Sequence, residues 1–162
     1  MNLWLIGMMG SGKSTIGPLV ASELAMGFID TDEEIETRLG ESIAEYWETH
    51  GEEDFRRAER AEIVRVSSSN AVISTGGGAP MSAANRATMM STGRIIWLRA
   101  DLDAIEDRLG DGEGRPVLGH RPIAEVMASR EKVYAALADA RFDTDMGTPE
   151  EISKEIVAWW AA

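Results

Sequence analysis

The segment with the most chemical content is the octapeptide GMMGSGKS at residues 7–14, which follows the apolar residues 3–6. It matches the pattern G-x-x-x-x-G-K-[ST] at every specified position. In such a loop, backbone N–H groups curl around phosphate oxygens, and the following helix adds the positive end of its dipole. We expect Lys13 to reach the β- and γ-phosphates of a nucleoside triphosphate and the Ser14 hydroxyl to ligate Mg²⁺. A glycine-rich turn that binds nothing is the alternative, and the complete match disfavours it.

Two carboxylates, Asp30 and Asp32, lie between a short apolar segment and the next helical stretch. Transfer of a γ-phosphoryl group requires a metal ion and an oriented acceptor hydroxyl. We expect Asp30 to help hold Mg²⁺ through a water molecule, and Asp32 to accept a proton from the acceptor or orient it. For either residue alone, capping of the next helix is an alternative of similar weight.

Three arginines, Arg56, Arg57 and Arg60, follow on one helical stretch. Arg56 and Arg60 share a face, where like charges repel unless an anion or carboxylates lie opposite. An anionic substrate would explain this arrangement. The sequence alone favours a solvated ion-pair face, because three glutamates lie close by, namely Glu52, Glu53 and Glu59.

Three later features add to the candidate site. Residues 76–78 are consecutive glycines after an apolar segment, which permits close approach of backbone to a ligand, although an ordinary turn would look the same. Arg115, in the glycine-rich segment 110–122, is placed to swing over phosphates, or it is a solvated loop arginine. Arg130 either grips a carboxylate or pairs with a glutamate of its own helix.

The elements that must position these residues alternate between short apolar strands and helical periodicity, which is typical of an α/β fold with a parallel sheet covered on both faces. The phosphate loop, the Asp30–Asp32 turn and the glycine turn each follow a strand, so we expect them to converge on one rim of the sheet. Gly27 is expected to end the first helix. The pattern predicts strands at 3–6, 28–29, 71–74, 95–98 and 141–143, and helices at 14–26, 33–39, 42–50, around 55–66, and at 82–91, 102–109, 123–137 and from 149.

Composition restricts the class of protein. A chain of 162 residues suits a single domain, residues 1–162. The 16 basic and 28 acidic side chains give a net charge of −12, which disfavours nucleic acid as a partner. Cysteine is absent and the two histidines, His50 and His120, are too few for a zinc site, so any metal is held by oxygen.

The expected location follows from the same inspection. The phosphate loop begins at residue 7, which leaves no room for a signal peptide, and no apolar run approaches the roughly 20 residues of a membrane span. We therefore expect a cytoplasmic protein without a membrane partner.

Taken together, the chemical features resemble one known family over essentially the whole chain. Only the phosphate loop is specific by itself, but six features in a fixed order are hard to obtain by chance. The order and spacing are those of shikimate kinases, carried by the phosphate loop, Asp30-Thr31-Asp32, Gly51-Glu52 followed by Phe55-Arg56-Arg57, Gly76-Gly77-Gly78, Arg115-Pro116, and Arg130 to Tyr134.

This resemblance implies a P-loop fold similar to that of nucleoside monophosphate kinases, with a five-stranded parallel sheet flanked by helices and a mobile lid at about 110–122. It implies transfer of the γ-phosphate of ATP, with Mg²⁺, to the 3-hydroxyl of shikimate. The product would be shikimate 3-phosphate, a step of chorismate and aromatic amino-acid biosynthesis. A monomer is expected.

Carried over residue by residue, the resemblance also implies roles. The catalytic residues would be Lys13, Asp32 and Arg115. Shikimate would be bound by Asp32, Arg56, Gly77, Gly78 and Arg130. ATP would be bound by Gly10, Ser11, Gly12, Lys13, Ser14, Thr15, Arg108, Arg115 and Pro149. The metal ion would be held by Ser14 and Asp30.

The chain departs from the family pattern in two places. Lys132 stands where the family usually has proline, two residues after the carboxylate-binding arginine. The turn at 145–148 lacks the basic residue that many members carry near adenine, so adenine contacts would depend on Arg108 and Pro149.

Two other functions compete with this interpretation. One is another small-molecule kinase of the same fold, acting on gluconate or a nucleoside monophosphate. The other is a nucleotide-binding switch without a phosphoryl acceptor. Asp32, Arg56 and Arg130 suit a polyhydroxy carboxylate better than either, and a switch would leave them without a task.

Overall fold

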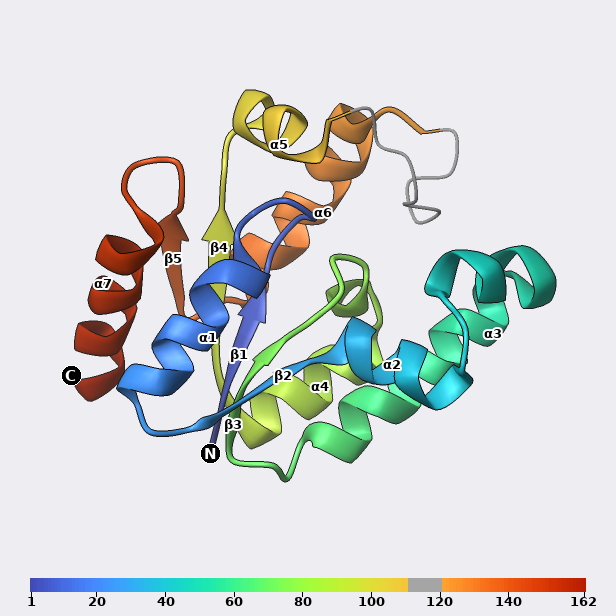
Figure 1. The fold of residues 1–162 in the computed structure, drawn as a ribbon, viewed down its shortest axis with the longest axis horizontal. Coiled ribbons are helices and arrows are strands. Elements are labelled where there is room, and N and C mark those ends of the chain that lie inside the picture. Colours follow the sequence, from blue (N-terminus) through green and yellow to red (C-terminus); the bar gives the residue numbers. More distant parts are fainter. Residues whose placement is uncertain (111–120) are drawn as a thin grey trace.

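The computed structural model describes residues 1–110 and 121–162, and in this part of the chain five strands form one sheet in which every neighbouring pair is parallel. The strand order is β2-β3-β1-β4-β5. Their carboxyl ends point to the same edge, the top of the sheet in Figure 1. The strands are β1 (Asn2–Ile6), β2 (Gly27–Asp30), β3 (Ala71–Ser74), β4 (Gly93–Arg99) and β5 (Ala140–Asp143). The predicted five-stranded parallel sheet is confirmed.

Helices cover both faces of the sheet, as the pattern predicted. Helices α1 and α7 pack together on one face, and α4, α6 and the second half of α3 cover the other. The helices are α1 (Lys13–Glu23), α2 (Thr31–Leu39), α3 (Ile43–Val66), α4 (Ala83–Thr92), α5 (Leu102–Leu109), α6 (Ile123–Leu137) and α7 (Pro149–Ala161), with a short 3₁₀ turn, η1 (Ala79–Met81). None of the helices in the described residues is both long and apolar enough to cross a membrane.

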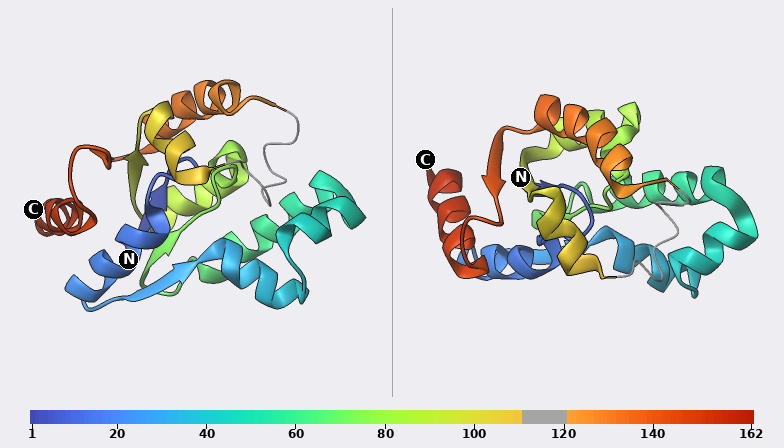
Figure 2. Two further views of the ribbon diagram at one scale, coloured as in Figure 1. Left: turned by 45° about the horizontal axis from the view of Figure 1, so that its top comes forward. Right: turned by 90° about the horizontal axis from the view of Figure 1, so that it is seen from above.

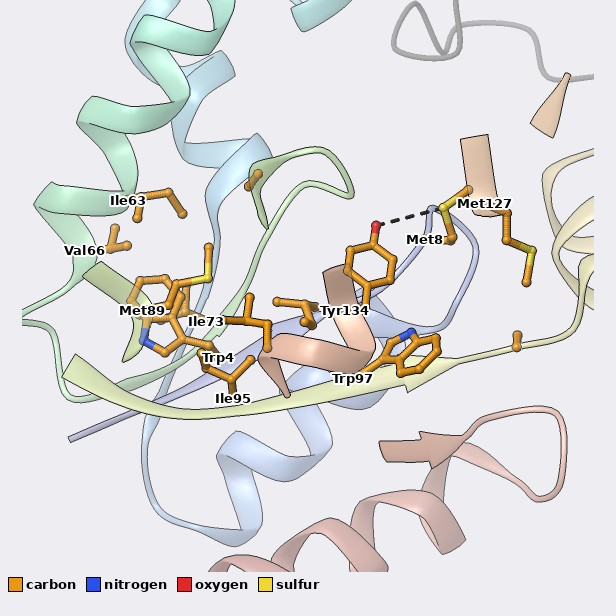
Figure 3. Close-up of a cluster of buried hydrophobic side chains, with 14 of the residues drawn as sticks. Trp4, Met8, Ile63, Val66, Ile73, Met89, Ile95, Trp97, Met127 and Tyr134 are labelled. Atoms are coloured by element: carbon orange, nitrogen blue, oxygen red, sulfur yellow. Dashed lines mark hydrogen bonds between the residues drawn. The ribbon is translucent and has the colours of Figure 1, made fainter. Parts of the chain in front are cut away.

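The core explains why β1 reads as an uninterrupted apolar run. Successive side chains of a strand point to opposite faces, and both faces are covered here. Leu3 and Leu5 pack against α1 and α7, whereas Trp4 and Ile6 point to the α4 and α6 side. Figure 3 shows this second cluster, in which Trp4 packs near Met89 and Tyr134 lies beside Trp97.

Of two glycines at predicted helix boundaries, Gly51 lies at such a boundary and Gly27 does not. Gly27 does not end the first helix, so that prediction is wrong: α1 stops at Glu23 with Leu24 as its cap, and Gly27 opens β2. Gly51 has φ 85° and ψ 172°, a backbone conformation that breaks α3 into two segments. The two helices predicted at 42–50 and around 55–66 are therefore the two segments of α3, and the boundary between them is a kink at Gly51.

Beyond the β2 edge of the sheet, α2 and the first half of α3 project as a separate arm, visible in both views of Figure 2. Within the arm, α3 begins with a reciprocal capping box, in which Ser42 Oγ accepts from the Glu45 N–H at 3.2 Å. It has a small core of its own, in which Ile35, Ile43 and Phe55 are buried together. The arm forms one wall of the site described next.

Candidate active site

The phosphate loop connects the end of β1 to the start of α1. Gly10 and Gly12 have positive φ angles of 73° and 99°, in the region that favours glycine. Gly7 is required for another reason, because a Cβ there would lie 2.3 Å from the carbonyl oxygen of Leu98 on β4. The octapeptide therefore forms a tight curve over the first turn of α1, as its sequence predicted.

Lys13 lies inside this curve and is buried. Its Nζ donates to the carbonyl oxygens of Gly7 and Met8, both at 2.8 Å, and lies 3.4 Å from Ser11 Oγ. The loop itself thus holds the ammonium group that we expect to contact the phosphate oxygens of a nucleotide.

Ser14 and Asp30 meet across the gap between α1 and β2. Ser14 Oγ donates to Asp30 Oδ2 at 3.2 Å. The other oxygen, Asp30 Oδ1, accepts from the Asp32 N–H at 3.0 Å and caps α2. Asp30 therefore caps α2, which was one of the two alternatives for this residue, and it also contacts Ser14, the other expected metal ligand.

A hydroxyl and a carboxylate are hard oxygen ligands of the kind that Mg²⁺ prefers. No group of three carboxylate or histidine side chains able to hold a metal occurs among the described residues. The donor set at Ser14 and Asp30 fits an ion that takes its remaining ligands from phosphate and water.

A cavity of about 330 Å³ opens over the phosphate loop, and most of the predicted ATP-binding residues line it. Arg108 on α5 closes one side, where its guanidinium donates to the Gly10 carbonyl at 2.9 Å and to the Thr144 carbonyl at 3.3 Å.

Pro149 occupies the first position of α7 and is not among the residues that line this cavity. Arg115 and most of the predicted lid lie outside the described residues. The lining residues are Met9, Gly10, Gly12, Lys13, Ser14, Thr15, Asp30, Asp32, Ser74, Thr75, Gly76, Gly77 and Arg108.

Thr144, after β5, was not predicted from the sequence. Its buried hydroxyl donates to the Ser11 carbonyl at 2.8 Å and so supports the phosphate loop from behind. A lone threonine in a turn has no sequence signal that would have marked it.

A second cavity, of about 340 Å³, lies between the arm and the glycine turn. It shares six lining residues with the nucleotide cavity, so the two spaces adjoin. The shared residues are Met9, Ser14, Asp30, Asp32, Gly76 and Gly77. An acceptor in the second cavity would lie next to phosphates in the first.

Asp32 stands at the junction of the two cavities. Burial raises the pKa of this carboxyl to about 7, and the nearby Asp30 and Glu59 carboxylates add to the rise. Gly76 permits the close packing, because a Cβ there would lie 2.8 Å from Asp32 Oδ1. A pKa near 7 suits a group that takes a proton from an acceptor hydroxyl near neutral pH.

Arg56 forms the floor of the acceptor cavity. Its Nη1 contacts both oxygens of Glu59, at 3.1 and 2.9 Å, and its guanidinium lies 5.5 Å from the ring centre of Trp47. A Cβ on Gly78 would come within 2.6 Å of this guanidinium. The side chain remains 23% exposed, so it can still meet a ligand.

Glu59 corrects the expectation of a solvated ion-pair face, because it is only 1% exposed. Burial raises the pKa of its carboxyl, whereas Arg56 opposes that rise. Phe55, Glu59, Ile63 and Val66 all face the core. Their spacing of four, four and three residues was the available signal, since it places Glu59 on the apolar face of the helix. Arg57 matches the surface expectation, because it is exposed and pairs with Asp54.

Arg130 is buried on α6, with 6% exposure, and its Nη1 has no hydrogen-bond partner among the described residues. Burial lowers the pKa of its guanidinium. A Cβ on Gly77 would lie 2.9 Å from this Nη1, so Arg130 lies against the glycine turn at the edge of the acceptor cavity, although it is not one of the lining residues. The helix runs unbroken through Lys132, so the missing proline leaves Arg130 in place.

Comparisons with known proteins agree with this geometry. The family model described as shikimate kinase matches residues 9–161. A shikimate kinase of Persephonella marina is 39% identical over 159 residues, which cover 96% of each chain.

Two solved structures are similar over nearly the full length. Shikimate kinase from Aquifex aeolicus superposes with a TM-score of 0.86 at 36% identity, covering 99% of this chain and 96% of the other. Shikimate kinase from Acinetobacter baumannii in complex with shikimate superposes with a TM-score of 0.92 at 28% identity, covering 99% and 92%. On the family match and the identity to these relatives, the chain belongs to the shikimate kinase family.

Proposed function

We propose that this chain transfers the γ-phosphoryl group of ATP to the 3-hydroxyl of shikimate, giving shikimate 3-phosphate on the route to chorismate and aromatic amino acids. The observation that carries the proposal is the junction at Asp32, where the cavity over the phosphate loop meets a second cavity lined by Arg56 and the glycine turn. Membership of the family makes the protein an ATP-dependent shikimate kinase.

On the donor side, backbone N–H groups of the phosphate loop and Lys13 hold the β- and γ-phosphates. Ser14 would ligate Mg²⁺, and Asp30 would orient a water of the ion; when bound, the ion neutralises charge on the transferred group. Arg108 lies where it can flank the nucleotide. Arg115 is proposed to stabilise the transferred charge.

On the acceptor side, Asp32 takes the proton of the attacking hydroxyl onto a carboxylate oxygen. As the bond from the acceptor oxygen to the γ-phosphorus forms, the bond from that phosphorus to the bridging oxygen breaks, and ADP leaves with the bridging oxygen. Arg56 and Arg130 bind the acceptor carboxylate, whose charge would satisfy the buried guanidinium of Arg130. The backbone at Gly77 and Gly78 approaches the ring. We propose a monomeric, cytoplasmic enzyme.

A coupled assay for ADP tests the assignment. With ATP and Mg²⁺ fixed, shikimate is expected to produce ADP well above the basal rate, whereas gluconate and nucleoside monophosphates are not. If gluconate or a nucleoside monophosphate drove the reaction and shikimate did not, the chain would be a different kinase of this fold. ADP production that no acceptor changes would favour a nucleotide switch.

A further inference from the structure

Tyr134 on α6 is a fully buried polar residue that the proposed reaction does not use. Its ring packs in the core beside Trp97, with ring centres 5.9 Å apart. Figure 3 shows its hydroxyl pointing toward Met8, the residue of the phosphate loop that belongs to the same cluster. Phenylalanine would fill the same apolar space without burying a hydroxyl, so the hydroxyl itself requires an explanation.

The hydroxyl contacts the glycine turn and the phosphate loop. It donates to the carbonyl oxygen of Gly77 at 2.6 Å, and Met8 Sδ lies 3.9 Å away. A hydroxyl has one proton to donate, and the shorter contact to the better acceptor takes it. Burial raises the pKa of the Tyr134 hydroxyl, which therefore stays protonated and remains a donor.

The bond to Gly77 fixes the orientation of a whole peptide unit. The Gly77 carbonyl and the Gly78 N–H belong to the same planar trans peptide and point in opposite directions. With the carbonyl directed at Tyr134 on α6, the N–H is directed away from Tyr134, and Gly78 itself lines the acceptor cavity. No described residue accepts a hydrogen bond from this N–H.

The same tyrosine also lies beside the carboxylate-binding arginine. Arg130 and Tyr134 are four residues apart on α6 and share a face, and the Arg130 charge acts on the pKa of the tyrosine. A Cβ on Gly77 would meet the Arg130 Nη1 at 2.9 Å and the Tyr134 hydroxyl at 3.5 Å. The three groups therefore form one packed unit behind the acceptor cavity.

We propose that Tyr134 is a positioning residue for the acceptor: its hydroxyl holds the Gly77–Gly78 peptide so that the Gly78 N–H faces the cavity and donates to an oxygen of shikimate. This inference rests on the proposed function and names a further determinant of acceptor binding. It assigns no role to Tyr134 in the transfer step itself.

Tyr134→Phe tests the proposal in steady-state kinetics. The KM for shikimate is expected to rise about 5- to 20-fold, since a carbonyl is left unpaired and the peptide is free to turn. The KM for ATP is expected to stay within about twofold of wild type. An unchanged KM for shikimate would overturn the proposal, as would an equal rise in both constants.

Ser153→Ala is the matched control. Ser153 is also fully buried, and its hydroxyl donates to Glu23 at 2.9 Å between α7 and α1, away from both cavities. Loss of this hydroxyl is expected to lower the melting temperature without changing either KM. A rise in the KM for shikimate in Ser153→Ala would show that general loosening explains both variants, and the proposal would fail.

An amide NMR titration of the wild-type chain gives a measurement that does not depend on a variant folding. Adding shikimate is expected to shift the Gly78 amide resonance and slow its hydrogen exchange. A Gly78 amide that does not respond while shikimate is turned over would overturn the role of this peptide. A wild-type chain that does not turn over shikimate at all would contradict the proposed function first, and the inference with it.

Discussion

The donor and acceptor cavities adjoin each other, yet they are assembled in different ways. On the donor side, one contiguous segment, residues 7–15, supplies six of the 13 lining residues, and the positive φ angles of its glycines shape the loop. The acceptor side is brought together from α2, α3, the turn after β3, and α6. A local motif thus provides phosphate binding, whereas tertiary packing provides the recognition of the acceptor.

The two sides also differ in how charge is handled. On the donor side, the ammonium group of Lys13 is held by backbone carbonyls of its own loop. On the acceptor side, Asp32 and Glu59 are placed near Arg56 and Arg130, and burial shifts the pKa of both carboxyls and of Arg130. Buried charges of both signs demand one particular partner, which makes this side the selective one.

The largest effect is expected from a substitution of Asp32, which lies where the donor and acceptor cavities adjoin. Asp32→Asn should lower kcat by about 10²- to 10⁴-fold, because the amide cannot take the proton of the attacking hydroxyl. The affinity for ATP, measured by calorimetry, should stay close to wild type. Asp103→Asn, an exposed change on α5, serves as the control. Retained turnover would remove Asp32 from catalysis and weaken the comparison.

Next in size is Lys13→Met, which removes the cation from the phosphate loop. We expect kcat to fall by about 10²- to 10³-fold, since a preorganised charge at the transferred group is lost. Shikimate binding without nucleotide should not change, and calorimetry in the absence of ATP checks this. The exposed Lys154→Met is the control. A large loss of shikimate affinity would show that the two sides are not separable.

Arg56→Lys should act on the acceptor side alone. An ammonium group cannot contact Glu59 and an acceptor carboxylate with the same planar fork, so the KM for shikimate should rise about tenfold. The KM for ATP should be unaffected. Arg57→Lys, one residue away but exposed, should leave both constants unchanged. If the two lysine variants behaved alike, Arg56 would be a surface charge.

The smallest effect concerns stability and pH. The folded protein holds the Asp32 proton up to a pKa of about 7, against an ordinary value of 3.8, so this residue lowers stability as pH rises from about 4 to 7. Asparagine carries no such cost. Asp32→Asn should therefore melt about 3 to 6 °C above wild type at pH 8 and nearly equal to it at pH 4. Thermal melts at several pH values check this, and a constant difference would contradict the raised pKa.

Much of the fold could be predicted because its signals are local. Apolar runs such as residues 3–6 and 71–74 predicted strands, and the helices predicted at 42–50 and from 149 begin next to the capping residues Ser42 and Thr148. Gly27 was misread because a glycine after a helical stretch serves equally as a cap or as the start of a strand. That choice depends on where the chain must turn to reach the sheet.

The candidate site divides in the same manner. The phosphate loop could be predicted because its motif is contiguous in the sequence. Glu59 was wrongly predicted to lie on the surface, because acidic residues beside arginines usually form solvated ion pairs. The support that Thr144 and Tyr134 give to the loops depends on contacts more than 50 residues away in sequence, to Ser11 and Gly77. Nothing in their immediate sequence specifies those partners.

The contacts of Lys13 have a consequence for the binding of nucleotide. Its ammonium group donates to two carbonyl oxygens of its own loop, so a phosphate that takes up this cation has to draw it from partners already in place. The carbonyl oxygens of the loop and a bound phosphate therefore compete for the ammonium group of Lys13. We expect this competition to lower the affinity for nucleotide below that of a loop whose lysine has no such partners.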